Sequence, residues 1–211
     1  ITLYIFYFYS TISFQSSCSF TPFQVFNKRA GTTDEGKEYE DVVLASVLLD
    51  LVNDPSVKYF NISSNDGDYG AFDDLIIKLE SDKMSDEVRV KAIQLKHTQN
   101  TQKRKLSTDK LRQENGDFSI KKYFKTFQKT KKPVDEFILF TNRLFKYEKD
   151  AKFQFGEGLH IKPVKSEDSL KLSDETSEVY QFEIVEDNPT VENIQEYKNF
   201  FGKFYLYTNQ Y

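Results

Sequence analysis

Three groups of side chains, far apart in the sequence, have the residue types that metal-dependent hydrolysis of a phosphodiester bond requires. Glu40 interrupts an otherwise apolar helical stripe. The adjacent acids Asp73 and Asp74 open an apolar strand, and the pattern Gln-x-Lys at Gln94 and Lys96 closes the next apolar strand. An acid on a helix, an acid at the start of one strand and Gln-x-Lys at the end of the next form the order expected of a metal-dependent phosphodiesterase.

The chemistry predicted for these side chains is that of a divalent cation with oxygen ligands. Buried carboxylates are costly unless they are paired, hydrogen-bonded or bound to a cation. A divalent ion between Glu40 and Asp73 or Asp74 would remove their repulsion, and the side-chain carbonyl of Gln94 would add a neutral ligand, a set suited to Mg²⁺ or Mn²⁺. Lys96 shares a strand face with Gln94, so it would orient or help to deprotonate a water and stabilise charge on the phosphate.

Each group also has an ordinary structural explanation. A single Glu on the apolar side of a helix is often an edge residue or part of an ion pair. Asp73 and Asp74 fit the turn-like entry of a strand, and Gln94 and Lys96 fit a solvated strand face. Their combination in one order along the chain favours the site over these separate explanations.

The helix that carries Glu40 is predicted from about residue 36 to residue 52, with Thr33 or Asp34 as its cap. It ends before the turn-forming sequence Asn53-Asp54-Pro55. The apolar side chains that follow Glu40 at helical intervals are Leu44, Val47, Leu48 and Leu51. Because these residues lie around the direction of Glu40 on a helix, Glu40 is predicted to point toward the core or a cleft.

Three strands are predicted after this helix, at residues 58–63, 72–80 and 88–97, with a tight polar turn at residues 65–70 and a hairpin loop at residues 80–87. In a strand that starts at Phe72, the neighbours Asp73 and Asp74 would face opposite ways. The sequence therefore leaves open which of the two acids is the ligand.

The second half of the chain is predicted to contain a helix, a buried strand, a further strand and a last helix. The first helix has an apolar stripe of Ile120, Tyr123, Phe124 and Phe127 with lysines around it. Residues 135–142 have the continuous apolar character of a strand buried on both faces, and a strand near 179–185 precedes a helix at about 190–200. This order predicts an α/β fold with a mixed central β-sheet flanked by helices.

The net charge of −4 conceals a strong polarisation along the 211-residue chain. Residues 102–132 hold eleven Lys or Arg against three acids, whereas residues 165–192 hold nine acids against two Lys. The basic segment is predicted to contact DNA backbone phosphates. A solvated helix surface is its alternative explanation, and base stacking is not expected because its aromatic residues have core spacing.

Composition excludes some classes of site and bounds the domain. Cys18 is the only cysteine, which excludes an intramolecular disulfide and a cysteine-rich zinc site.

Residues 1–14 are apolar but shorter than the roughly 20 residues that span a bilayer, so no membrane association is expected. We expect residues 1–29 to be an extension outside the fold, residues 30–211 to form a single domain, and the location to be intracellular, cytoplasmic or nuclear.

Three segments carry a resemblance to a known family: Gly36-x-x-Tyr39-Glu40, Gly70-Ala71-Phe72-Asp73-Asp74-Leu75-Ile76 and Ile93-Gln94-Leu95-Lys96-His97. Together they resemble the PD-(D/E)xK nuclease superfamily, most nearly the Mrr-like restriction endonucleases and the nuclease domains found at the N-terminus of large defence proteins. The likeness covers about residues 36 to 97 at the level of motifs.

This resemblance implies a restriction-endonuclease-like fold and Mg²⁺-dependent hydrolysis of DNA. Glu40 matches the family's helix acid, Asp73 or Asp74 the strand acid, Gln94 the variable acid position and Lys96 the lysine. It also implies an effector module of a larger defence or toxin-like protein, with further domains after residue 211. The alternative is a catalytically inactive relative that binds nucleic acid or another protein.

Overall fold

The computed structural model describes residues 12–15, 34–81, 88–99, 105–149, 151–166, 177–186 and 192–210. The described strands are β1 (Ile12–Gln15), β2 (Val57–Ser63), β3 (Leu75–Ser81), β4 (Arg89–Lys96), β5 (Glu136–Thr141), β6 (Phe153–Phe155), β7 (Leu159–Lys165), β8 (Glu178–Glu186) and β9 (Phe204–Thr208). The described helices are α1 (Asp34–Asn53), α2 (Thr108–Arg112), α3 (Ile120–Lys129), α4 (Ile194–Phe201) and the 3-10 helix η1 (Gly67–Phe72).

The strands form one mixed sheet in the order β1-β2-β3-β4-β5-β9-β8-β7-β6. Strands β4, β5 and β9 are parallel neighbours, whereas the other pairings are antiparallel. Helices lie on both faces, so the predicted α/β fold with a mixed sheet flanked by helices is confirmed. The carboxyl ends of β4, β5 and β9 meet at one edge, which is where α/β proteins commonly place functional side chains.

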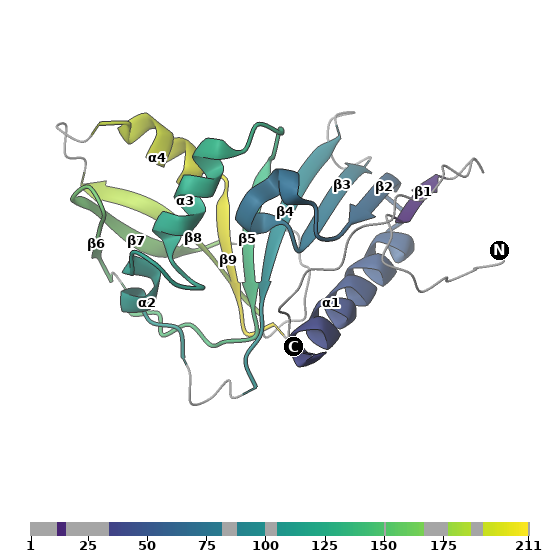
Figure 1. Ribbon diagram of the computed structural model, residues 1–211, viewed down its shortest axis with the longest axis horizontal. Coiled ribbons are helices and arrows are strands. Elements are labelled where there is room, and N and C mark those ends of the chain that lie inside the picture. The colour runs from purple at the N-terminus through teal and green to yellow at the C-terminus, as the bar shows by residue number, and fades with distance from the viewer. Residues whose placement is uncertain are drawn as a thin grey trace.

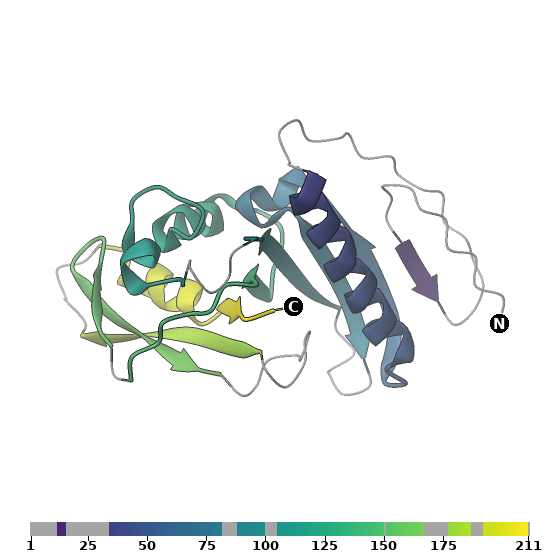
Figure 2. The ribbon, with the colours of Figure 1, turned by 90° about the horizontal axis from the view of Figure 1, so that it is seen from below.

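Two apolar clusters occupy the two faces of the sheet. Val43 and Val47 of α1 pack with Ile93 and Leu95 of β4 in one cluster. The second cluster contains Ala92 of β4 together with residues of η1, α3 and α4. Figure 1 shows α1 beside the end of the sheet that contains β1 to β4. Figure 2 shows α1 lying over this part of the sheet with β1 to one side of it, and α2, α3 and α4 at the other part of the sheet. No helix in the described part of the chain is long and apolar enough to cross a membrane.

The elements predicted from a periodic apolar pattern lie where they were predicted, whereas β3 begins later than predicted. The expected helix at 36–52 and the expected strands at 58–63, 88–97 and 135–142 correspond to α1, β2, β4 and β5. The helix expected from the apolar stripe that begins at Ile120 corresponds to α3. Strand β3 begins at Leu75 rather than at Phe72, because residues 67–72 form η1. Residues 82–87 of the expected hairpin loop lie outside the described residues.

Strand β1 lies within residues 1–29, the segment expected to extend outside the fold. It pairs antiparallel with β2, with Ile12 opposite Ile62. The rest of that segment lies outside the described residues. Helix α2 and strands β6, β7 and β9 were not predicted.

Gly70 permits the close packing of η1 against α3. Its φ of 63° and ψ of −116° lie in a region that residues with a side chain rarely adopt. A Cβ at this position would lie 2.8 Å from Cγ2 of Thr126 on α3. Backbone conformation and the approach of α3 therefore both require glycine.

We expect Gly70→Ala to lower the free energy of unfolding by about 1–3 kcal/mol, because it combines backbone strain with a steric clash. The measurement is urea-induced unfolding followed by circular dichroism. Gly67→Ala is the matched control, since a Cβ at Gly67 would meet no heavy atom within 4 Å. Equal unfolding midpoints for the two variants would contradict the role assigned to Gly70.

Candidate functional site

Asp73 and Asp74 lie at the junction between η1 and β3 and not within the strand. Asp73 has the helical angles φ −91° and ψ −7°, and its carbonyl accepts a hydrogen bond from the N–H of Asp66 at 3.1 Å. Both acids are buried, with exposed fractions of 3% and 7%. Because the strand begins only after them, the alternation expected from a strand starting at Phe72 does not decide which acid is a ligand.

The carboxylate of Asp74 is tied to the end of β4. Its Oδ2 accepts a hydrogen bond from the backbone N–H of Leu95 at 2.8 Å. Leu95 lies between Gln94 and Lys96, so this bond places the acid pair beside the predicted Gln-x-Lys pattern. The antiparallel register, with Leu75 opposite Ile93, brings the same segments together.

Gln94 and Lys96 point to the face of the sheet that α3 covers. Ile93 and Leu95 pack into the cluster of α1, and side chains alternate along a strand. Gln94 is 4% exposed, whereas Lys96 is half-buried. A buried amide and a partly accessible ammonium group therefore lie on one face, next to two buried carboxylates.

Helix α3 adds Lys122 to this group, a residue that sequence reasoning did not single out from the basic segment 102–132. Burial, and next the proximity of Lys96, lower the pKa of Lys122, while Asp117, Asp73 and Asp74 act in the opposite direction. Lys122 is thus within electrostatic reach of both strand acids and of Lys96. No local signal identifies it, because the approach depends on the packing of α3 against η1.

Glu40 lies in a different layer from the other predicted site residues. Its helix packs in the cluster that contains Leu95, on the face opposite to Gln94 and Lys96. Its own side chain is half-buried. The structure therefore brings Asp73, Asp74, Gln94 and Lys96 together, and it places Glu40 on the helix that covers the other face.

The beginning of α1 nevertheless reaches the carboxyl edge of the parallel strands. The ring of Tyr39 stacks on that of His97 with 4.8 Å between centroids, and its hydroxyl donates a hydrogen bond to the carbonyl of Gln210 at 3.4 Å. Burial raises the pKa of Tyr39 well above its usual value. Glu40, one residue later, is therefore near the edge where β4 ends.

Polar contacts fix the ends of the three parallel strands to one another. The N–H of Thr98 donates to Oδ1 of Asn142 at 3.0 Å, and Nδ2 of Asn142 donates to the carbonyl of Thr98 at 2.9 Å. Beyond β9, the N–H of Gln210 donates to the carbonyl of Thr141 at 3.2 Å. These bonds hold the segment after Lys96 in place.

The oxygen donors of the site fit Mg²⁺ through a small protein ligand set. Asp73, Asp74 and Gln94 offer two carboxylates and one amide carbonyl, all buried. Mg²⁺ is commonly held by one or two carboxylates, with waters and substrate phosphate oxygens as the remaining ligands. Among the described residues, no three His, Cys, Asp or Glu side chains are grouped so that they could hold a metal ion. A metal here would thus depend on the acid pair and Gln94.

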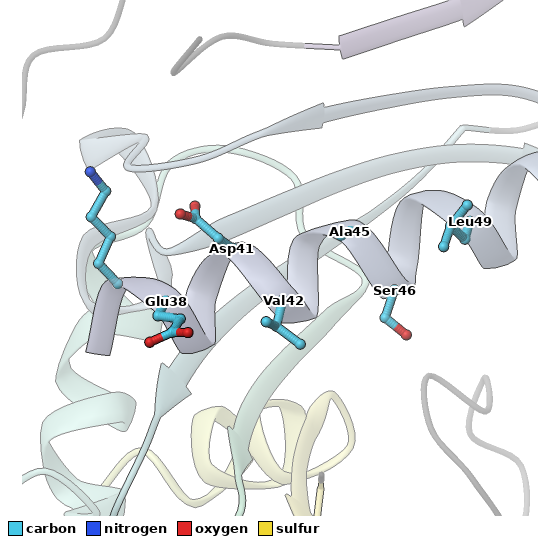
Figure 3. Close-up of a pocket in the computed structure, with 7 residues that line it drawn as sticks. Glu38, Asp41, Val42, Ala45, Ser46 and Leu49 are labelled. Atoms are coloured by element: carbon cyan, nitrogen blue, oxygen red, sulfur yellow. The ribbon is translucent and has the colours of Figure 1, made fainter. Parts of the chain in front are cut away.

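A separate hollow of about 630 Å³ follows the outward face of α1. Its lining residues are Lys37, Glu38, Asp41, Val42, Ala45, Ser46 and Leu49. Figure 3 shows the six from Glu38 to Leu49 following one another along the helix. Val42 and Leu49 are 59% and 58% exposed. The hollow does not include the predicted site residues.

Comparison of the chain with protein-family models, with curated proteins and with solved structures found no match. The chemical interpretation of the site therefore rests on the positions and types of its own side chains.

We expect Asp74→Ala to lower the free energy of unfolding by about 1–3 kcal/mol, because it leaves the buried N–H of Leu95 without its acceptor. Asp74→Asn is the matched control, since its amide oxygen still accepts this hydrogen bond. Urea unfolding of both variants measures the difference. A loss of the same size in both would show that the bond to Leu95 does not account for the effect.

Proposed function

We propose that this chain is an Mg²⁺-dependent nuclease domain with a restriction-endonuclease-like fold, related to the PD-(D/E)xK superfamily, that hydrolyses phosphodiester bonds in DNA. The supporting observation is the hydrogen bond from Leu95 to Asp74, which joins the acid pair to the Gln-x-Lys strand end. This bond joins two segments that are separate in the sequence, so the acid pair lies beside the strand end that carries Gln94 and Lys96.

Each of these side chains has a role in the proposal. Asp73, Asp74 and Gln94 would hold the cation, which when bound would polarise the phosphate and lower the pKa of a water. Lys96 would stabilise negative charge on the phosphate and orient the attacking water. Glu40 is the expected ligand that the structure supports least, because its helix covers the opposite face.

The basic segment 102–132 would contact the DNA backbone. Its described part includes α2 and α3, which pack in the same cluster as Ala92 of β4. Ala92 shares a strand face with Gln94 and Lys96. Lysine and arginine that neutralise phosphates provide affinity without sequence preference. In a longer parent protein the domain would act as the effector module of a defence or toxin-like system.

An inactive relative that binds nucleic acid or protein is the second candidate. Gln94 occupies the position where the family usually has an acid, and among the described residues no three acidic, histidine or cysteine side chains could hold a metal together. A neutral ligand weakens the attraction for a cation, so the fold and the basic segment would persist without turnover.

The test is cleavage of plasmid DNA in Mg²⁺ by the unmodified chain, by Lys96→Ala and by a double Asp73→Asn, Asp74→Asn variant. The Asn substitutions keep the acceptor for Leu95 while removing both charges. We expect each variant to lose at least about 100-fold in rate, as removal of a group that stabilises transition-state charge does. Lys149→Ala, at an exposed position outside the basic segment, is the control for loss of one positive charge.

The possible results separate the two candidates. Cutting by the unmodified chain that stops on addition of EDTA, and that the site variants lose, supports the nuclease. Equal nicking by all proteins indicates a contaminant and removes the enzymatic proposal. DNA binding without cutting, with a steep dependence on salt, favours the inactive relative.

A further inference from the structure

Two lysines from different elements lie on the side of the sheet that α3 covers. Nζ of Lys122 lies 5.5 Å from the ring centroid of Tyr123, whose ring contacts Phe72 directly before the acid pair. Lys96 is the last residue of β4, and Lys122 lies in the first turn of α3. The two lysines interact electrostatically, and both are half-buried. Like charges repel more strongly away from bulk water, so an anion between them would stabilise the arrangement.

Other lysines of the basic segment are already engaged in ion pairs. Lys121 pairs with Glu114, and Lys132 pairs with Asp68 at 3.1 Å. In the part of the chain that the structure describes, neither Lys96 nor Lys122 forms an ion pair. Their donors are therefore available to an anionic ligand.

The backbone of Lys122 is held firmly. Its N–H donates to Oγ of the capping residue Ser119 at 3.2 Å. The next residue, Tyr123, is fully buried, and its ring centroid lies 4.9 Å from that of Phe72, directly before the acid pair. The Tyr123 hydroxyl also donates to the carbonyl of Asp117 at 2.5 Å. These contacts fix the position of α3 relative to the acid pair.

We propose that Lys122 binds the reacting phosphodiester together with Lys96, so that the two lysines form a clamp on its non-bridging oxygens. This inference rests on the proposed function and refines it. Each ammonium group carries three donors, and hydrogen bonds between ionised partners are the strong ones. The remaining lysines of the basic segment would contact flanking phosphates, whereas Lys122 would contact the phosphate that reacts.

A substrate with a single phosphodiester separates these roles. We would measure kcat/KM for bis(p-nitrophenyl) phosphate in Mg²⁺ for the unmodified chain, Lys122→Ala, Lys122→Arg and Lys149→Ala. Lys149 is exposed and lies outside the basic segment, so it is the control for loss of one positive charge. We expect Lys122→Ala to lose about 10- to 100-fold, the worth of one charge-assisted hydrogen bond. Lys122→Arg should recover most of the rate because it keeps a cation, and Lys149→Ala should stay within about twofold.

A second measurement distinguishes failure of the clamp from failure of the nuclease. Fluorescence anisotropy with a labelled DNA duplex in EDTA gives the affinity of each variant without turnover. If the unmodified chain cuts nothing but Lys122→Ala binds about tenfold more weakly than Lys149→Ala, the nuclease proposal is overturned and the clamp is supported. Equal effects of Lys122→Ala and Lys149→Ala overturn the clamp whether or not the chain is active, and absence of DNA binding overturns both proposals.

Discussion

The hydrogen bond between the Asp74 carboxylate and the N–H of Leu95 is the interaction on which the candidate site depends. A buried carboxylate needs partners, and a backbone amide at the end of a neighbouring strand is a partner that cannot rotate away. Because Leu95 separates Gln94 from Lys96, the same bond fixes the acid pair relative to both. Loss of this acceptor would loosen β3, β4 and the site together, so stability and chemistry are coupled here.

Strand alternation then decides which helix contributes to the site. Since Ile93 and Leu95 face α1, Gln94 and Lys96 must face the layer that contains α3. This layer carries the basic segment, and its approach to β4 is fixed by the close packing of α3 on η1 at Gly70. Helix α1 mainly buries apolar side chains and reaches the strand ends through Tyr39. Glu40 therefore lies on the α1 side of the sheet, opposite the side that Gln94 and Lys96 face.

The sequence predicted those parts that depend on local periodicity and missed those that depend on tertiary packing. The helical stripe beginning at Ile120 and the continuous apolar run of β5 are local signals, and both elements were predicted. The predicted start of β3 at Phe72 was wrong because Phe72 is the last residue of η1. The ring of Phe72 packs on that of Tyr123, which is distant in the sequence. Strand β7 contains Pro163, a residue that argues against a strand in a sequence. The proximity of Asp73, Asp74, Gln94 and Lys96 follows from strand order, whereas that of Lys122 required the packing of two distant elements.

Charge balance explains how a neutral Gln94 is compatible with the proposed chemistry. The acid pair and the two lysines cancel one another in formal charge, so a third carboxylate would leave an uncompensated negative charge in a largely buried site. With Gln94 in that position, a divalent cation would bind less tightly to the protein alone. Oxygens of the substrate phosphate would then supply more of its binding energy. Mg²⁺ is often bound in this way, through few carboxylates and a phosphate. In the proposed complex a phosphodiester would interact with both the cation and the lysines, so metal and DNA would each strengthen the binding of the other.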